Sequence, residues 1–325
     1  MVAPADFTEY ILKTEKKLIF MKKIISLLTA GLLGISLAAC GKKSDNKDTV
    51  KIAYLPITHS LAVLETADEL SEKSGLQVEL VKYGSWNELM DALNSGRVDG
   101  ASVLIELAMK SKEQGIGLKA VALGHKDGNV IVVSDKINSA EDLKGKTIAI
   151  PHRQSSHNIL LNDALAKAGL TTDDINITEL APTEMPSALA GGQIDGYCVA
   201  EPFGAKAVSI NAGKVLFTSE ELWEDSLCCG LVLTDRFIEE NPDDARNFTE
   251  SYKQAGKNLT KDKALEVAEK YLNQDKDVLE LSLQWISYDN LDITEEDYAL
   301  LAEKVKSYGL SDNPPSYDDF VKNDF

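Results

Sequence analysis

The sequence predicts an α/β fold made of two similar lobes, and three observations predict it. From Thr49 onward, short apolar segments typical of strands alternate with segments that carry apolar residues at helical spacing, a pattern that indicates a parallel sheet covered by helices. The same pattern recurs once further along the chain. After Asp235 the segments are helical. With 325 residues, the chain is long enough for two lobes with well-buried cores.

The first run of elements extends from Val50 to Leu123. Its strands are expected at Val50–Leu55, Gln77–Val81, Val98–Leu104 and Leu118–Leu123. Its helices are expected around a stripe of Leu61, Leu64, Ala67 and Leu70, and at Trp86–Asn94 and Glu106–Gln114. Helices that alternate with strands in this way are typical of parallel strand connections.

Two motifs of the first run return in a second run at one constant offset. Lys51–Tyr54 corresponds to Thr147–Ile150, and Leu93–Gly100 corresponds to Leu189–Gly196. A helix lies between them, with apolar residues at Leu161, Ala164, Leu165 and Ala168. We therefore expect two equivalent lobes, with one compact domain containing a long-period repeat as the alternative.

Two short apolar strands, Val130–Ser134 and Gly230–Thr234, bracket the second run and are the expected crossovers between the lobes. Residues 49–126 plus 228–325 are therefore assigned to lobe 1, and residues 127–227 to lobe 2. The closing helices are expected to pack on lobe 1. They are placed at Asp243–Leu259, Lys261–Asn273, Val278–Tyr288 and Glu295–Tyr308.

A secretory signal is expected before the fold. Met21-Lys22-Lys23 is basic, Ile24–Leu37 is apolar, and small residues then lead to Cys40, an order typical of a signal peptide rather than of a membrane span. The cysteine predicts a bacterial lipoprotein signal with lipidation at Cys40, and an ordinary signal peptide is the alternative. Residues 1–39 are thus an N-terminal extension and signal peptide, with the start codon open between Met1 and Met21, and residues 40–48 are a flexible tether. We expect the protein at the cell membrane, lipid-anchored on its extracytoplasmic face.

The composition excludes several classes of function. The net charge of −18 argues against binding to nucleic acid and against broad contact with anionic lipid. Besides Cys40 the chain has Cys198, Cys228 and Cys229, and an odd number is not typical of a disulfide framework. There is no Gly-rich phosphate loop with Lys and no Gly-x-Ser-x-Gly motif. The repeated Asp-Gly pairs are expected at turns or strand starts rather than as catalytic acids. We expect a monomer that is not an enzyme.

The candidate binding site lies where the first strand of each lobe ends. Ligands of open α/β sheets bind beyond the carboxyl ends of the strands, and a helix start offers free N–H groups and the positive end of a dipole. This arrangement favours an anion, to which Arg153 adds a bidentate guanidinium. The alternative for each serine is a helix cap alone. The candidates in the two loops are Thr58, His59 and Ser60, and His152, Ser155, Ser156 and His157.

Further candidates follow the other strands. Trp86 is expected either as an apolar wall of the site or as a helix-start residue packed on the core. Glu106 and Glu201 end the third strand of each lobe, where a carboxylate can bind an amine or a metal, or accept hydrogen bonds across a closed cleft. His125 lies at the first crossover, so all four histidines lie near one predicted cleft. A metal site is conceivable from such groups, but no His-x-x-x-His or Cys-x-x-Cys spacing occurs. We therefore assign the histidines as hydrogen-bonding groups, with no metal and no cofactor.

Several segments carry a resemblance to a known family. They are Gly84-Ser85-Trp86, Asp99-Gly100-Ala101, Asp142–Lys146, Ser156-His157-Asn158 and Gly192–Phe203. The chain resembles the substrate-binding lipoproteins of bacterial ABC importers in the nitrate, bicarbonate, sulfonate and taurine group. The resemblance implies a periplasmic-binding-protein-like α/β fold, with two lobes, a ligand cleft and two crossover strands. It also implies capture of a small anion or sulfonate-like solute, delivery to a permease with its ATPase, and a pocket lined by Trp86, the Pro151–His157 loop and the Glu201 region.

The sequence departs from the nitrate branch of this family at two places. Ser102 stands where nitrate-type members tend to have His, and residues 222–230 have no counterpart of their basic residue. Cys228-Cys229 resembles part of the cysteine cluster of thiamine-pyrimidine synthase-like proteins, which share the fold. The alternatives are therefore a binding protein for a thiamine-pyrimidine precursor and a pyrimidine-synthase-like metal-dependent enzyme. A surface adhesin, with an exposed apolar patch, is a third.

Overall fold

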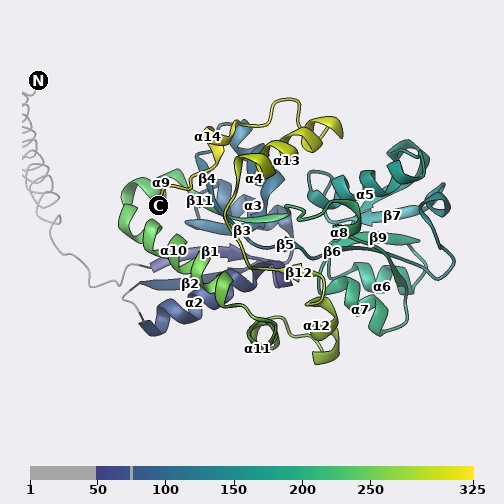
Figure 1. The fold of residues 1–325 in the computed structure, drawn as a ribbon, viewed down its shortest axis with the longest axis horizontal. Coiled ribbons are helices and arrows are strands. Elements are labelled where there is room, and N and C mark those ends of the chain that lie inside the picture. The colour runs from purple at the N-terminus through teal and green to yellow at the C-terminus, as the bar shows by residue number, and fades with distance from the viewer. Residues whose placement is uncertain (1–48, 74–75) are drawn as a thin grey trace, which may run out of the picture. The chain divides into compact units, whose positions relative to one another are not determined.

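The structure, a computed structural model, describes residues 49–73 and 76–325. The expected signal peptide, the lipidation site Cys40 and the tether at residues 40–48 lie outside the described residues. The described part is a mixed α/β fold with two five-stranded sheets and helices packed around them (Figure 1). Among the described residues, no helix has both the length and the apolar character needed to cross a membrane.

The first sheet has the strand order β2-β1-β3-β11-β4. Strand β1 pairs in parallel with β2 and β3, whereas β11 runs antiparallel to β3 and β4. Figure 1 shows β11, which comes late in the sequence, inserted among the earliest strands. The strands are β1 (Thr49–Tyr54), β2 (Gln77–Lys82), β3 (Gly100–Leu104), β4 (Leu118–Leu123) and β11 (Cys229–Thr234). The helices between them are η1 (Thr58–Ser60, a 3-10 helix), α2 (Leu61–Lys73), α3 (Trp86–Asn94) and α4 (Ile105–Glu113).

The second sheet has the order β10-β6-β9-β7-β8. Strand β7 pairs in parallel with β8 and β9, and β6 runs antiparallel to β9 and β10. The strands are β6 (Asn129–Val133), β7 (Thr147–Ile150), β8 (Asn176–Glu179), β9 (Gly196–Ala200) and β10 (Lys214–Thr218). The helices are η2 (Ala140–Leu143), α5 (Ser156–Lys167), η3 (Thr172–Asp174), α6 (Met185–Ala190), α7 (Phe203–Ser209) and α8 (Ser219–Leu222).

The sequence repeat corresponds to a structural repeat with a physical cause. The Asp99 carboxylate accepts from the backbone N–H of Lys51 at 2.9 Å, and the Asp195 carboxylate accepts from that of Thr147 at 2.9 Å. A Cβ atom on the following Gly100 would lie 2.7 Å from the Val232 carbonyl oxygen, and one on Gly196 would lie 2.8 Å from that of Val132. Each Asp-Gly pair therefore joins the first parallel strand to the third and lets the antiparallel strand approach. This assigns both aspartates to the scaffold.

The closing helices contact helices that belong to both sheets, and not to the first sheet alone. Helix α10 packs against α2, and α12 packs against α7 of the second sheet. The expected helix at Val278–Tyr288 is wrong in its second half, because it ends at Ser282 and Ile286–Ser287 form strand β12. Strand β12 pairs with β5 (Lys126–Asp127), and this tertiary pairing outweighs the local helical pattern. The helices are α9 (Asp235–Glu240), α10 (Pro242–Asn258), α11 (Lys261–Tyr271), α12 (Lys276–Ser282), α13 (Glu295–Ser307) and α14 (Tyr317–Phe320).

Candidate functional site

One edge of the first sheet gathers residues that lie far apart in the sequence. We call it the first-sheet edge, formed by the carboxyl ends of β1, β3 and β4 and the start of β11. Because β11 is antiparallel, its first residue, Cys229, pairs with Leu104, the last residue of β3. His59 follows β1 and His125 follows β4. The topology thus brings both histidines and the cysteine pair to one place.

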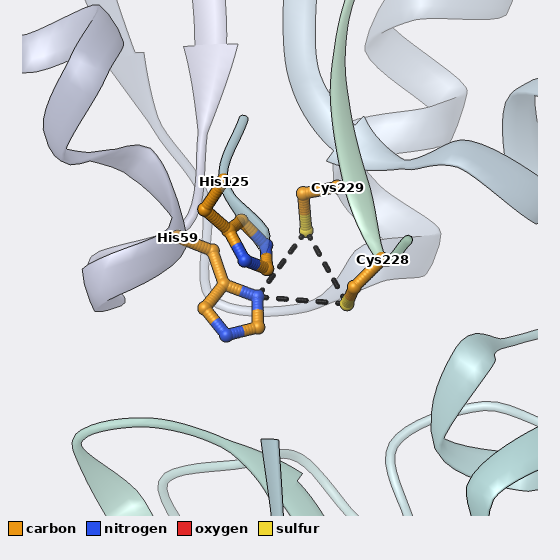
Figure 2. Close-up of side chains that lie close together, drawn as sticks. All are labelled: His59, His125, Cys228 and Cys229. Atoms are coloured by element: carbon orange, nitrogen blue, oxygen red, sulfur yellow. Dashed lines mark hydrogen bonds between the residues drawn. The ribbon is translucent and has the colours of Figure 1, made fainter. Parts of the chain in front are cut away.

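These four side chains converge on one another (Figure 2). The His59 Nδ1 atom lies 3.5 Å from the Cys228 Sγ atom and 3.6 Å from the Cys229 Sγ atom, and the two sulfurs are 3.8 Å apart. The His125 ring stacks against the His59 ring with centroids 3.6 Å apart. All four side chains are buried, so the cluster is shielded from solvent.

The thiols and imidazoles have shifted proton affinities. Burial alone raises the pKa of the Cys228 thiol, but hydrogen bonding from Cys229 and the positive character of His59 outweigh burial and lower that pKa well below its ordinary value. Burial, with the neighbouring Cys228 charge, raises the pKa of Cys229 instead. Burial, and next the charge of His59, lowers the pKa of His125 to about 4. These directions favour ionisation of the Cys228 thiol before that of Cys229, and a neutral His125 imidazole at pH 7.

The facing edge of the second sheet carries hydroxyl and imidazole groups. Ser155 is the N-cap of α5 and accepts from the Asn158 N–H, so its role as a helix cap is established. Ser156 and His157 follow it at the start of the helix, and their side-chain polar atoms are buried without a hydrogen-bond partner among the described residues. Burial lowers the pKa of His157 to about 4, which keeps its imidazole neutral at pH 7.

Two buried carboxyl groups flank these residues. Both oxygens of Glu106, at the start of α4, lack a hydrogen-bond partner in the described part of the chain, and burial raises its pKa well above the ordinary value. In Glu201, Oε2 accepts from the Ala205 N–H at 3.0 Å while Oε1 has no partner in that part. Burial raises the pKa of Glu201 to about 8. Burial therefore favours the protonated form of both carboxyl groups, which offers one O–H donor as well as acceptor oxygens.

The two edges meet through hydrogen bonds to two backbone carbonyls. Thr58 donates to the Glu201 carbonyl from both its N–H and its hydroxyl, at 2.9 Å each. The Gly128 carbonyl, just before β6, accepts from His59 Nε2 at 2.8 Å and from the Glu201 N–H at 3.1 Å. Thr58 and the backbone of Glu201 thus join the sheets.

The remaining predicted site residues, Ser60, Trp86 and His152, lie outside the cluster of Figure 2. Ser60 Oγ lies 3.4 Å from Ser102 Oγ on β3, and both side chains are buried. Trp86 is buried at the start of α3, and its indole N–H has no partner among the described residues. His152 is only partly buried and lines a separate groove of ≈ 340 Å³ beside α3 and α4.

The expectation for Arg153 is wrong. Its side chain is exposed, and its guanidinium donates to the Ile177 carbonyl on β8 at 3.1 Å. Among the described residues, no Lys or Arg side chain is buried. An anion at the buried edges would therefore be held by neutral donors and a helix start rather than by a cationic side chain.

Sequence reasoning left two groups out of the candidate site. Cys228 and Cys229 carry only a partial resemblance to a synthase cysteine cluster and were not among the predicted ligand-binding residues, and Asn129 was not considered. Asn129 starts β6 and pairs with Ala200, the last residue of β9, which matches the position of Cys229 in the first sheet. The predicted antiparallel crossover strands were the usable signal, because the start of such a strand lies at the carboxyl edge of its parallel neighbours.

Two antiparallel crossover strands, two sheets and a polar site where their edges face define a periplasmic-binding-protein fold, which solved structures similar to this chain share. The chain belongs to the NMT1-like family, whose model matches residues 43–273. A crystal structure of the ligand-binding component of an ABC-type import system from Staphylococcus aureus, with zinc bound, is 40% identical. The match covers 85% of this chain and 97% of that one, with a TM-score of 0.82.

Curated relatives match over shorter shares of their length. The nitrate import ATP-binding protein NrtC of Synechocystis sp. is 33% identical over 57% of this chain, and the match covers 31% of that protein. The taurine-binding periplasmic protein of Escherichia coli is 30% identical over 62% of this chain and 63% of that protein. The chain thus spans less than two thirds of the length of both.

Proposed function

We propose that this protein is the solute-binding component of an ABC importer and captures a small polar solute between the two sheet edges. The observation that carries the proposal is the set of buried polar side chains without hydrogen-bond partners in the described structure. Glu106 comes from the first-sheet edge, and Ser156 and His157 come from the edge of the second sheet. A buried polar group left without a partner costs roughly 1–3 kcal/mol, so a ligand that satisfies several of them gains affinity from both sides.

The solute class that we propose is a small anion or sulfonate-like molecule. The names of the relatives, which include nitrate, taurine and aliphatic sulfonates, support this class. The start of α5 supplies N–H groups and a favourable dipole for an acidic end, and Ser156 adds a hydroxyl. No Lys or Arg side chain of the described residues is buried, and an amine can hydrogen-bond to the Glu106 carboxyl. We therefore favour an amino-sulfonate such as taurine over nitrate. Bicarbonate and a thiamine-pyrimidine precursor are the other candidates.

Closure around the solute would use contacts that already link the two sides. Lys304 of α13 pairs with Asp163 of α5 at 2.9 Å, and both side chains are largely buried. Gln154, in the loop before α5, donates to the Leu310 carbonyl at 2.7 Å. A solute that touches both edges favours the state in which these contacts form, which couples binding to closure.

The proposed function also includes the lobe bounds, the membrane anchor and the partners of the protein. We place residues 49–126 plus 228–325 in lobe 1 and residues 127–227 in lobe 2, with Cys40 lipidated on the extracytoplasmic face of the cell membrane. The partners are a permease and its ATPase, and the protein acts as a monomer without catalysing a reaction. The substantially exposed large apolar side chains of the described residues, Ile210 and Leu300, lie on different elements, which gives little support to an adhesin.

A thermal-shift panel tests this function. Taurine, alkanesulfonates, nitrate, bicarbonate and thiamine-pyrimidine precursors are each added to the purified protein, because a ligand that binds the folded state raises Tm. We expect one class to raise Tm in the wild type and to lose that effect in Ser156→Ala. The matched control is Ser209→Ala, whose hydroxyl is exposed and donates to Lys206 on α7. A folded protein that no solute stabilises would refute the proposal.

A further inference from the structure

The buried cluster at the first-sheet edge has the composition of a metal site. His59, His125, Cys228 and Cys229 each offer one ligand atom, and these atoms lie within 4.8 Å of one another. Two imidazole nitrogens and two thiolates are a set that Zn²⁺ takes in proteins. Figure 2 shows that His59, His125 and the adjacent pair Cys228-Cys229 come from different segments and that the four side chains point toward one another.

The distances between the atoms fit tetrahedral coordination. A tetrahedral Zn²⁺ with Zn–S bonds of ~2.3 Å and Zn–N bonds of ~2.1 Å places its two sulfurs about 3.8 Å apart and each sulfur about 3.6 Å from a nitrogen. The Cys228 and Cys229 sulfurs are 3.8 Å apart, and His59 Nδ1 lies 3.5 and 3.6 Å from them. These three atoms already form one face of the tetrahedron, and His125 lies beside it to complete the set.

The orientation of His59 is fixed by its other nitrogen. Its Nε2 lies 2.8 Å from the Gly128 carbonyl, and because a carbonyl only accepts, Nε2 carries a proton. In the neutral imidazole, Nδ1 then presents its lone pair toward the two sulfurs. A hydrogen bond from the second imidazole nitrogen to a backbone carbonyl is the usual support of a metal-binding histidine. Gly128 has φ +80, and a Cβ there would lie 3.0 Å from Nε2, so glycine is required for this contact.

The ring nitrogens of His125 are buried and lack hydrogen-bond partners in the described part of the chain. Neither of its ring nitrogens has a partner among the described residues, and the side chain is fully buried. Buried imidazoles are normally hydrogen-bonded or bound to a metal. A bond from His125 to an ion held by the other three atoms satisfies this side chain.

We propose that His59, His125, Cys228 and Cys229 form a four-coordinate site for a thiophilic divalent cation, with Zn²⁺ as its occupant. As the two Zn–S bonds form, both thiols release their protons to solvent, and the two thiolates balance the charge of the ion. Mg²⁺ and Ca²⁺ prefer oxygen ligands, which this set does not offer. All four ligands are attached to segments of the first sheet, so the site goes beyond solute capture and does not depend on it.

Metal titration of the purified protein tests the site. The protein is stripped of metal, kept reduced with a phosphine, and titrated with Zn²⁺ against a chromophoric chelator, and separately with Co²⁺. We expect one equivalent of Zn²⁺ per chain, no competition from Mg²⁺ or Ca²⁺, and the intense visible and sulfur-to-metal bands of tetrahedral thiolate-bound Co²⁺. Cys228→Ala and Cys229→Ala should each weaken Zn²⁺ binding by about 100-fold or more, because each removes a ligand.

Cys198→Ala is the matched control, because Cys198 is also a buried free cysteine but lies on β9. It should bind Zn²⁺ like the wild type. Circular dichroism shows whether each variant is folded, and the Co²⁺ spectrum of the wild type stands without any variant. An octahedral Co²⁺ spectrum, no Zn²⁺ binding, or equal binding by folded Cys228→Ala and Cys229→Ala proteins would overturn the proposal.

Discussion

The two sheet edges share a scaffold but differ in their chemistry. In both sheets an aspartate joins the first strand to the third, and an antiparallel strand starts beside the end of the third strand. At that starting position the first sheet has Cys229 and the second has Asn129. The first edge therefore collects sulfur and imidazole atoms, whereas the second presents hydroxyl, amide and imidazole groups at a helix start. The repeat preserves strand geometry, and the residues just beyond the strands determine what each edge can bind.

The largest expected effect concerns the carboxyl group of the second edge. Burial raises the pKa of Glu201 from 4.5 to about 8, so the folded protein keeps a proton that the unfolded chain releases above pH 4.5. Stability should therefore fall as pH rises from about 4.5 to 8. Glu201→Gln removes this loss and should raise the free energy of unfolding at pH 8 by on the order of a few kcal/mol.

Urea denaturation across this pH range measures the effect. The exposed Glu220 provides the control, because Glu220→Gln changes no buried group. The same pH slope in the wild type and in Glu201→Gln would show that Glu201 is ionised in the folded protein. That result would break the comparison, because an ionised Glu201 would make the second edge strongly acidic.

The shared scaffold predicts matched effects in the two sheets. A Cβ on Gly100 or Gly196 would approach a backbone carbonyl oxygen at 2.7 or 2.8 Å. Gly100→Ala and Gly196→Ala should each lower the free energy of unfolding by roughly 1–3 kcal/mol, because the strands must move apart. At Gly84 the nearest atom to a new Cβ is 3.7 Å away, so Gly84→Ala serves as the control. An unchanged free energy of unfolding in either variant would show that the two glycines do not play the same structural role in the two sheets.

Two ion pairs link the closing helices to helices of the second sheet, and they should contribute to stability according to how deeply they are buried. Lys304 and Asp163 are 19% and 12% exposed, whereas Asp275, which pairs with Lys206, is 79% exposed. Asp163→Asn should cost about 1–2 kcal/mol of stability because Lys304 loses a shielded partner, and Asp275→Asn should cost less than about 0.5 kcal/mol. Chemical denaturation of both variants gives the difference, and equal costs would mean that the Lys304 pair does not hold the two sides together.

The smallest effects separate two neighbouring serines of the second edge. Ser155 caps α5, so Ser155→Ala should cost about 1 kcal/mol of stability. Ser156 has a buried hydroxyl without a partner in the described structure, so Ser156→Ala should leave stability nearly unchanged while it weakens solute binding. Thermal unfolding and titration with the solute distinguish them. Loss of stability in Ser156→Ala with solute binding intact would reassign that residue to the scaffold.

The sequence could predict the scaffold because periodicity and repeats are local signals. Strand β4 and helix α3 have the predicted bounds, and the crossover strands β6 and β11 differ by one residue at the ends. Strand β12 was not predicted, because its pairing with β5 is a contact between distant segments. The histidines were placed near one cleft from the sequence, but their proximity to Cys228 and Cys229 depends on the antiparallel insertion of β11 beside β3. Spacing rules for metal sites do not detect ligands brought together by topology.

A crystal structure of the protein grown with the best solute of the thermal-shift panel tests the central claim most directly. The account predicts solute density between the two edges, in contact with Glu106 on one side and with Ser156 or His157 on the other. Solute density only in the groove that His152 lines beside α3 and α4 would contradict the account, because the buried polar groups of both edges would then have no ligand.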